Sequence, residues 1–252
     1  MAVKRSLSAG RMLSVFELVA RQQPVGVSVL ARELGADKSA VQRDIMTLAD
    51  AGWIRAVPGL RGQWELTLHA LALARPPHSS HSLRHRLRPM LERLHEATGE
   101  TVYLTLPYQK HFIVVDALES QHLLRVVPSI GMSVPMQGSA TARAYLAFLP
   151  AREQEELLGA PPTAAMLEDF SRTRTRGYAI NDGDVHPGSI AIAAPVLTGP
   201  SQPVGALVVV GPADRIAPER RADIGQALKE AGQGVMAAWP RDTTPATQTI
   251  EA

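Results

Sequence analysis

The sequence predicts an α+β protein in two parts, an N-terminal winged helix-turn-helix and a larger C-terminal domain with a central, mostly antiparallel sheet. Two observations predict this fold. Residues 10–51 hold three stretches of helical periodicity, and residues 53–66 then alternate apolar and polar side chains around a turn. Residues 101–237 mix strand-like and helix-like stretches, which is typical of an α+β domain.

The three N-terminal helices are expected over residues 10–22, 28–34 and 38–51. Each stretch carries apolar side chains at the i, i+3, i+4 spacing of one helix face. Gly35 and Gly52 follow the second and third stretches, and glycine is a common residue just past a helix end.

A β-hairpin is expected directly after these helices. Residues 53–57 and 63–66 alternate apolar and polar side chains, and the turn-forming residues 58–62 separate them. Three short helices followed by a hairpin have the layout of a winged helix-turn-helix.

The rest of the chain is expected to begin with a polar linker at 75–82 and a helix at 83–97. The remaining predicted elements are strands at 101–106, 112–118, 123–127, 133–136, 190–196 and 204–210, and helices at 139–148, 151–158, 164–176 and 218–237. The tail from Arg241 is rich in Thr and Pro, and we expect it to be disordered.

Composition narrows the class of protein. The chain has no cysteine, which removes disulfides, thiolate metal ligands and cysteine nucleophiles. It has no run of 18 apolar residues and no secretory leader, so we expect a cytoplasmic protein without a membrane partner.

Charge is distributed unevenly along the chain. Residues 1–65 carry nine Lys and Arg against six Asp and Glu, whereas residues 96–252 carry 12 against 17. A basic N-terminal part and an acidic C-terminal part favour contact between the N-terminal part and a polyanion. Chance patterning is the alternative.

The polar face of the third helix provides the candidate DNA contacts. Gln and Arg are the side chains that make paired hydrogen bonds to adenine and guanine, and short polar or cationic residues suit phosphates. The expected contacts are Lys38, Ser39, Gln42, Arg43 and, at the hairpin tip, Arg61. The alternative is an ordinary solvated helix face.

Several segments in the right order carry a resemblance to a known family. Residues 30–43 (LARELGADKSAVQR) and 48–54 (LADAGWI) resemble the helix-turn-helix of the IclR family of bacterial regulators. Further along, similar segments are 134–147, RTRGYA at 174–179 with Gly188 and 193–196 (AAPV), and Gly211-Pro212 with Arg215 and Pro218. Together the resemblance covers about residues 6–238.

The resemblance implies a DNA-binding transcription regulator rather than an enzyme. It implies a winged helix-turn-helix at 1–74, a linker and linker helix at 75–97, a GAF-like effector-binding domain at 98–240 and a tail at 241–252. The implied partners are a palindromic double-stranded operator, a small-molecule effector and further copies of the chain in a dimer or tetramer. No cofactor and no metal are implied.

The family's effector lies in a cup between the sheet and its covering loops. Carried over by motif, the lining here is Ala140, Thr141, Asp182 in the loop after Tyr178, Ala191, Val208 and Val210. The sequence departs from the family at Ala142-Arg143, where Gly-Lys is usual, and at Gly183, which interrupts an acidic pair.

These positions favour a small organic acid, aromatic or otherwise hydrophobic. The start of the helix at 139–148 would offer free N–H groups to a carboxylate. The apolar strand positions would hold a ring or an alkyl chain. Alternatively, Val208 and Val210 are ordinary sheet core and Thr141 caps its helix.

Other chemistry is not visible in the sequence. P-loop, dinucleotide-binding, HExxH and GxSxG motifs are absent. His78, His81 and His85 have metal-like spacing but lack an acidic partner, and Asp182, Asp184 and His186 come closest to an acid/base cluster. An enzyme with a DNA-binding front end and a DNA-binding protein without a ligand remain the alternatives. The sequence leaves open the effector, the operator, the sign of regulation and the number of subunits.

Overall fold

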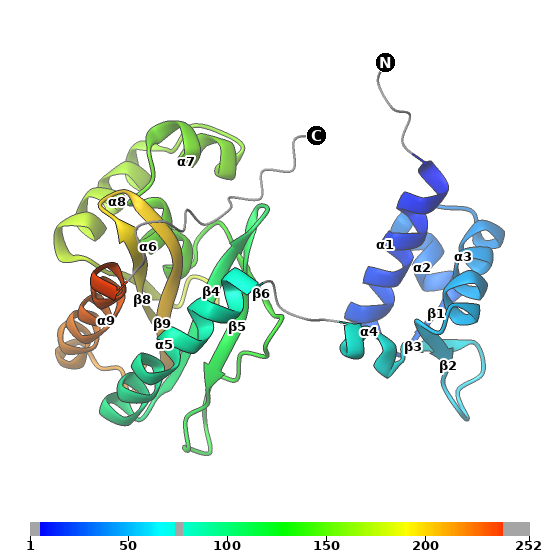
Figure 1. Cartoon of the computed structure of the whole chain (residues 1–252), viewed down its shortest axis with the longest axis horizontal. Helices are drawn as coiled ribbons and strands as arrows, with labels where there is room; N and C mark the ends of the chain where they lie inside the picture. Colours follow the sequence, from blue (N-terminus) through cyan, green and yellow to red (C-terminus); the bar gives the residue numbers. More distant parts are fainter. Residues whose placement is uncertain (1–5, 74–77, 239–252) are drawn as a thin grey trace. The chain divides into compact units, whose positions relative to one another are not determined.

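A computed structural model describes residues 6–73 and 78–238, and the chain divides into two units, residues 1–77 and 78–252 (Figure 1). Each unit has its own hydrophobic core. The elements of the first unit are α1 (Leu7–Gln22), β1 (Val25–Gly26), α2 (Val27–Leu34), α3 (Lys38–Asp50), β2 (Ile54–Ala56), β3 (Gln63–Leu66) and α4 (Leu68–Leu73).

The first unit is a winged helix-turn-helix, as predicted. Helices α1, α2 and α3 bury one apolar face each in a shared core that includes Val15, Leu30 and Ile45. Gly35 ends α2 with a φ of 57°, a left-handed conformation that glycine adopts without the steric cost of a Cβ. The chain therefore turns sharply from α2 into α3.

Two short elements of this unit were not predicted. Strand β1 adds to the hairpin, so that the wing is a three-stranded antiparallel sheet in the order β1-β3-β2. Helix α4 follows β3 directly. Neither two residues of strand nor six residues of helix are long enough to show a period in the sequence.

The second unit is built on one six-stranded antiparallel sheet in the order β6-β5-β4-β9-β8-β7. Its elements are α5 (His78–Thr98), β4 (Thr101–Tyr108), β5 (His111–Leu118), β6 (Ser133–Pro135), α6 (Ala140–Leu146), α7 (Ala151–Leu158), α8 (Ala164–Arg176), β7 (Ala179–Asp182), β8 (Ser189–Gly199), β9 (Gln202–Pro212) and α9 (Pro218–Ala238). The predicted α+β class is therefore confirmed.

Helices cover both faces of this sheet. Helices α5 and α9 pack on one face, and α6, with α8 against it, packs on the other (Figure 1). Because side chains alternate along a strand, neighbours in β4 and β9 belong to different cores. Tyr103 and Val208 join the core under α6, whereas Leu104 and Val209 join the core under α5 and α9.

Three predictions for this unit were wrong. Residues 123–127 are not a strand, and Leu123 is fully exposed in a loop. Asp182 is not in a loop after Tyr178, because residues 179–182 form β7 at the edge of the sheet. Residues 78–82, expected to be part of the linker, belong to α5, which begins at His78.

Part of the expected linker and the expected disordered tail, 241–252, lie outside the described residues. Within residues 6–73 and 78–238, no helix is both long and apolar enough to cross a membrane.

Candidate nucleic-acid interface and ligand cavity

The exposed face of α3 is held at its start by a well-formed cap. Asp37 accepts hydrogen bonds from the backbone N–H groups of Ser39 and Ala40 and from the Ser39 hydroxyl, at 2.5 to 3.2 Å. These bonds, with the side-chain bond from Ser39 foremost, hold the pKa of Asp37 below its usual 3.8. The first turn of α3 is therefore ordered without DNA.

Most of the predicted DNA contacts are exposed and unengaged. Lys38, Gln42, Arg43 and Arg61 are exposed, and none makes a side-chain hydrogen bond or ion pair with another described residue. The hydroxyl proton of Ser39 is instead committed to Asp37. Four of the five predicted side chains are thus free to meet a partner.

The buried side of α3 is fixed by an ion pair that the sequence analysis missed. Asp44 is almost fully buried and receives two hydrogen bonds from the guanidinium of Arg11 on α1, at 2.6 and 3.3 Å. The same bonding raises the pKa of Arg11. The two residues are 33 apart, so no local spacing could have revealed the pair.

A cavity of about 250 Å³ lies in the second unit between α6, the sheet and two loops. Its walls are mostly apolar, with hydroxyl groups, an amide and one imidazole among them. Its lining is Tyr103, Val126, Pro128, Met132, Ser133, Val134, Pro135, Ser139, Ala140, Thr141, Asn181, Val185, His186, Ser189, Ala191 and Val210.

Four of the six predicted effector contacts line this cavity. They are Ala140 and Thr141 at the start of α6, Ala191 on β8 and Val210 on β9. Val208 faces the same side of the sheet but is fully buried in the core and does not reach the cavity.

Asp182 also does not line the cavity, because its carboxylate points to α9 and pairs with Arg221 at 2.8 Å. The preceding residue of β7, Asn181, lines the cavity instead. Thr141 is not the helix cap, since the hydroxyl of Ser139 accepts from the N–H of Ala142.

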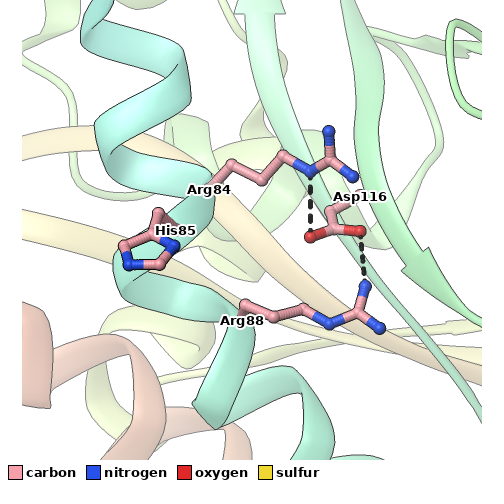
Figure 2. A pocket seen from close by; sticks show the side chains of 4 residues that line it. All are labelled: Arg84, His85, Arg88 and Asp116. Carbon is pink, nitrogen blue, oxygen red and sulfur yellow. Dashed lines mark hydrogen bonds and ion pairs between the residues drawn. The ribbon is translucent and has the colours of Figure 1, made fainter.

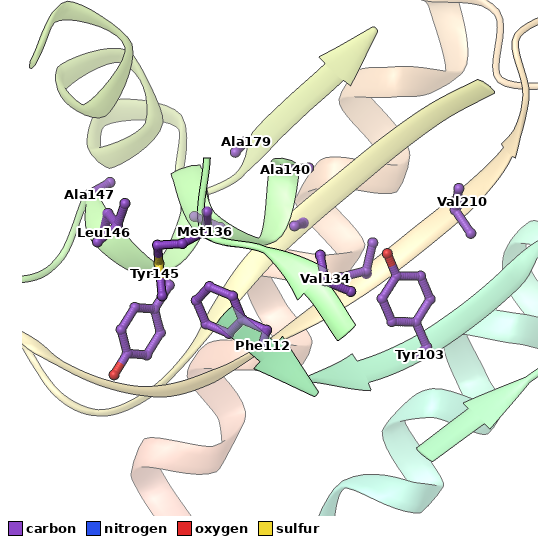
Figure 3. Packing of buried hydrophobic residues seen from close by; sticks show 14 of the residues in the cluster. Tyr103, Phe112, Val134, Met136, Ala140, Tyr145, Leu146, Ala147, Ala179 and Val210 are labelled. Atoms are coloured by element: carbon purple, nitrogen blue, oxygen red, sulfur yellow. The ribbon is translucent and has the colours of Figure 1, made fainter. Parts of the chain in front are cut away.

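Tyr103 on β4 is one of the lining residues that sequence reasoning missed (Figure 3). It is 7% exposed, and burial raises the pKa of its phenol to about 12, a rise partly offset by its interaction with the side chain of Thr141. Strand alternation could have placed it on this face of the sheet, but no motif marks it.

The loop that follows β7 is tied down at the side of the cavity. Arg143 on α6 donates to the carbonyl of Ile180 and pairs with Asp184 at 2.6 Å. The amide nitrogen of Asn181 donates to the carbonyl of Gly138 and to Asp184. These bonds hold the start of α6, β7 and the loop as one frame.

A second hollow, of about 340 Å³, lies where α5 crosses β5 (Figure 2). Asp116 is 1% exposed and sits between Arg84 and Arg88, whose guanidinium nitrogens lie 3.2 and 2.9 Å from its oxygens. His85 projects away from this pair (Figure 2). The arrangement attaches α5 to the sheet.

No acid/base or metal cluster emerges from the described residues. Asp182 and Asp184 are each paired with an arginine, and His186 is exposed beside the cavity. No group of three His, Asp or Glu side chains in the described part of the chain could hold a metal ion. The side chains of His78 and His81 lie outside that part.

A winged helix-turn-helix with a free polar recognition face, joined to a domain that encloses a cavity, defines a DNA-binding regulator with an effector-binding domain. Two family models agree with this class. Residues 8–58 match the IclR helix-turn-helix domain, and residues 78–237 match the C-terminal domain of the bacterial transcriptional regulator IclR. The chain therefore belongs to the IclR family, whose members regulate transcription and are not enzymes.

Individual relatives cover nearly the whole chain. The transcriptional repressor IclR of Escherichia coli K12 is 28% identical over 92% of this chain and 89% of its own length. An IclR transcriptional regulator from Silicibacter is 25% identical, with a TM-score of 0.74 over 92% of this chain and 95% of its own.

A third relative carries a ligand. An IclR homolog from Microbacterium hydrocarbonoxydans, solved in complex with 4-hydroxybenzoate, is 18% identical, with a TM-score of 0.73 over 92% of this chain and all of its own. At that identity the likeness concerns the fold.

Proposed function

We propose that this regulator binds a palindromic operator as a homodimer or homotetramer in the cytoplasm, and that a small hydrophobic monocarboxylate changes its affinity for that operator. An aromatic acid is the favoured effector. The observation that carries the proposal is the cavity of about 250 Å³ between α6 and the sheet.

The DNA half of the proposal rests on the exposed face of α3. Arg43 and Gln42 are suited to paired hydrogen bonds with guanine and adenine in the major groove. Lys38 and Arg61 are suited to the phosphates on either side of that groove. One such face reads a single half-site, so a symmetric pair of subunits and a palindromic operator follow naturally.

The effector half rests on the size and lining of the cavity. Pockets for drug-sized ligands usually span about 300–1,000 Å³, so a smaller cavity favours a small acid. Val126, Val134 and Val210 offer apolar walls to a ring. The 4-hydroxybenzoate complex of the Microbacterium relative supports the same class of ligand. A regulator without a ligand would have this space filled with side chains.

The first experiment selects genomic DNA fragments that the full-length protein retains at a fixed, near-physiological salt concentration, because phosphate contacts make affinity salt-dependent. Recovery of one palindromic site supports the proposal. Equal retention of all fragments contradicts it.

The second experiment measures binding to that site by fluorescence anisotropy with 4-hydroxybenzoate, benzoate, phenylacetate and acetate added in turn. A change in affinity with at least one of the three aromatic acids, and none with acetate, is expected. Replacing both Gln42 and Arg43 with Ala should abolish site preference. The control is Arg152→Ala, which removes an exposed arginine of α7 that pairs only with Glu156 among the described residues.

A further inference from the structure

We infer that Tyr103 and Thr141 recognise an uncharged hydroxyl or carbonyl group at the buried end of the effector, while the effector's carboxylate stays at the cavity mouth beside His186. The inference rests on the proposed function, because it gives the effector proposed there an orientation and a second functional group. The ligand class is a hydroxy- or oxo-substituted monocarboxylate with an apolar middle.

The described lining of the cavity contains no lysine or arginine. Among the described residues that line the cavity, Tyr103 and His186 are the only ones with ionisable side chains. Arg143, although close in sequence to Thr141, is engaged with Ile180 and Asp184 and is not part of the lining. A carboxylate buried without a cation carries a large desolvation cost. The buried end of the cavity therefore offers a carboxylate no cation, and we place the carboxylate at the mouth instead of at the start of α6, where the sequence analysis expected it.

Several hydrogen-bond donors in the cavity wall are already engaged with other protein groups. A hydroxyl has a single proton to donate. The hydroxyls of Ser139 and Ser189 already donate to the backbone carbonyls of Pro135 and His186, at 2.7 and 2.8 Å. The two N–H groups of the Asn181 amide are likewise bound, one to the carbonyl of Gly138 and one to the carboxylate of Asp184. None of these three side chains has a free donor for a ligand without breaking its own bond.

The remaining buried hydroxyls are those of Tyr103 and Thr141, which are 7% and 1% exposed. The two side chains interact with each other, which takes up at most one of their two protons and leaves the other for a ligand. The phenol stays protonated near neutral pH, since burial raises its pKa to about 12. The two hydroxyls can therefore hydrogen-bond one neutral oxygen of the ligand, either a hydroxyl, which donates and accepts, or a carbonyl, which accepts.

The mouth of the cavity has the opposite character. His186 and Ser133 both line it and are both exposed. A carboxylate placed there keeps most of its water while meeting a hydroxyl and an imidazole. Between the mouth and the buried pair, Ala191 and Val210 supply apolar wall for the middle of the ligand.

The test removes the same hydrogen bond from the ligand and from the protein in turn. Isothermal titration calorimetry on the full-length protein compares benzoate with 3- and 4-hydroxybenzoate. We expect the wild type to bind one of the two hydroxybenzoates at least about 10-fold more tightly than benzoate, because a site that hydrogen-bonds a hydroxyl discriminates against a ligand without one. Tyr103→Phe should bring that ratio close to one. Terephthalate, which carries a second charge at the buried end, should bind more weakly than benzoate.

The matched control is Tyr145→Phe. Tyr145 is also a buried tyrosine of this core with a pKa raised to about 12 by burial, but it lies at the other end of the cluster and does not line the cavity (Figure 3). This variant should keep the hydroxybenzoate preference. It shows what the loss of a buried phenol does to the core alone.

Three results overturn the inference. If Tyr103→Phe keeps the preference, or the wild type has none, the buried pair does not recognise the ligand, although the proposed function stands. If terephthalate binds more tightly than benzoate, the buried end accepts charge. If the wild type binds none of these monocarboxylates, the effector class in the proposed function fails as well.

Discussion

Arg43 and Lys38 share the exposed face of α3 but are expected to contribute to DNA binding in different ways. Arg43→Ala should cost about 1–3 kcal/mol on the preferred operator, because paired hydrogen bonds to one base are lost. The loss should be smaller on an operator already altered at that base pair. Anisotropy titrations against operators with single base-pair changes measure both effects.

Lys38→Ala is the natural comparison. A lost phosphate contact should weaken binding about equally on every sequence and reduce the salt slope of the binding constant by about 1. If Arg43→Ala behaves in this way too, Arg43 contacts a phosphate rather than a base.

At the cavity, the sequence predicted which face of a strand a residue occupies but not which residues of that face line the cavity. Alternation along β9 correctly placed Val208 and Val210 on one face of the sheet, but only Val210 reaches the cavity. A family motif suggested Asp182, yet β7 turns Asn181 to the cavity and Asp182 to Arg221. In a strand, a shift of one residue exchanges the two faces of the sheet. Because the segment was expected to be a loop, the motif did not show which face each of its side chains would occupy.

At the scale of elements, the cap of α3 makes the DNA-binding unit sensitive to acid. The pKa of Asp37 is lowered in the folded state, so its ionised form stabilises the fold above about pH 4, and this contribution is lost as the pH falls through the lowered pKa. Asp37→Ala should lower the melting temperature by a few degrees at neutral pH. Thermal melts at a series of pH values, followed by the fluorescence of Trp53 and Trp64, measure this.

Asp37→Asn separates charge from geometry. Asparagine caps helices about as well as aspartate, so this variant should stay near wild-type stability at neutral pH. As the pH falls below about 4, it should lose less stability than the wild type. Parallel loss in both proteins would mean that other carboxylates dominate the acid transition.

The attachment of α5 depends on Asp116, which forms ion pairs with Arg84 and Arg88 (Figure 2) and accepts hydrogen bonds from Arg88 and from the N–H of Ala117. Asp116→Asn should lower the free energy of unfolding by about 1–3 kcal/mol, because a buried acceptor loses its charge. The cost should stay below the roughly 3–5 kcal/mol of a fully buried pair, since both arginines are about 40% exposed and can turn to water. Urea denaturation monitored by circular dichroism gives the number.

The control for Asp116 is an exposed pair of similar type. Glu156→Gln breaks the exposed ion pair with Arg152 on α7 and should change stability by less than about 0.5 kcal/mol. An equally small effect of Asp116→Asn would show that α5 is held by its apolar face alone, through residues such as Leu87 and Leu91.

Long elements were predictable from sequence because a buried face repeats several times along them. Helices α3, α8 and α9 and strands β8 and β9 fall close to their predicted positions. Residues 123–127 are apolar enough for a strand but pair with no strand of the sheet, and it is β6 that lies beside β5. The four residues of β7 become a strand only through pairing with β8. Which edge is free is a property of the whole sheet.

At the scale of the whole molecule, the cavity belongs to one unit only. A ligand such as 4-hydroxybenzoate at about 100 times its dissociation constant should add about 2.7 kcal/mol to the free energy of unfolding of that unit. Hydrogen exchange should then slow for the most protected amides of β4, β9 and α6. The amides of α1, α2 and α3 should exchange as before.

Equal slowing in both units would contradict this expectation and would mean that the chain unfolds as a single cooperative body. No slowing in either unit, at a concentration that saturates calorimetric binding, would place the ligand outside the cavity.

The sheet of the second unit separates two kinds of constraint within each strand. On β4, Tyr103 faces the cavity while its neighbour Leu104 supports α5 and α9, and Ala191 and Ile192 divide in the same way on β8. Substitutions at the positions that face the cavity can therefore change its chemical lining, while the alternate positions keep their packing against α5 and α9. One such scaffold is able to serve regulators for quite different metabolites, changed one side chain at a time.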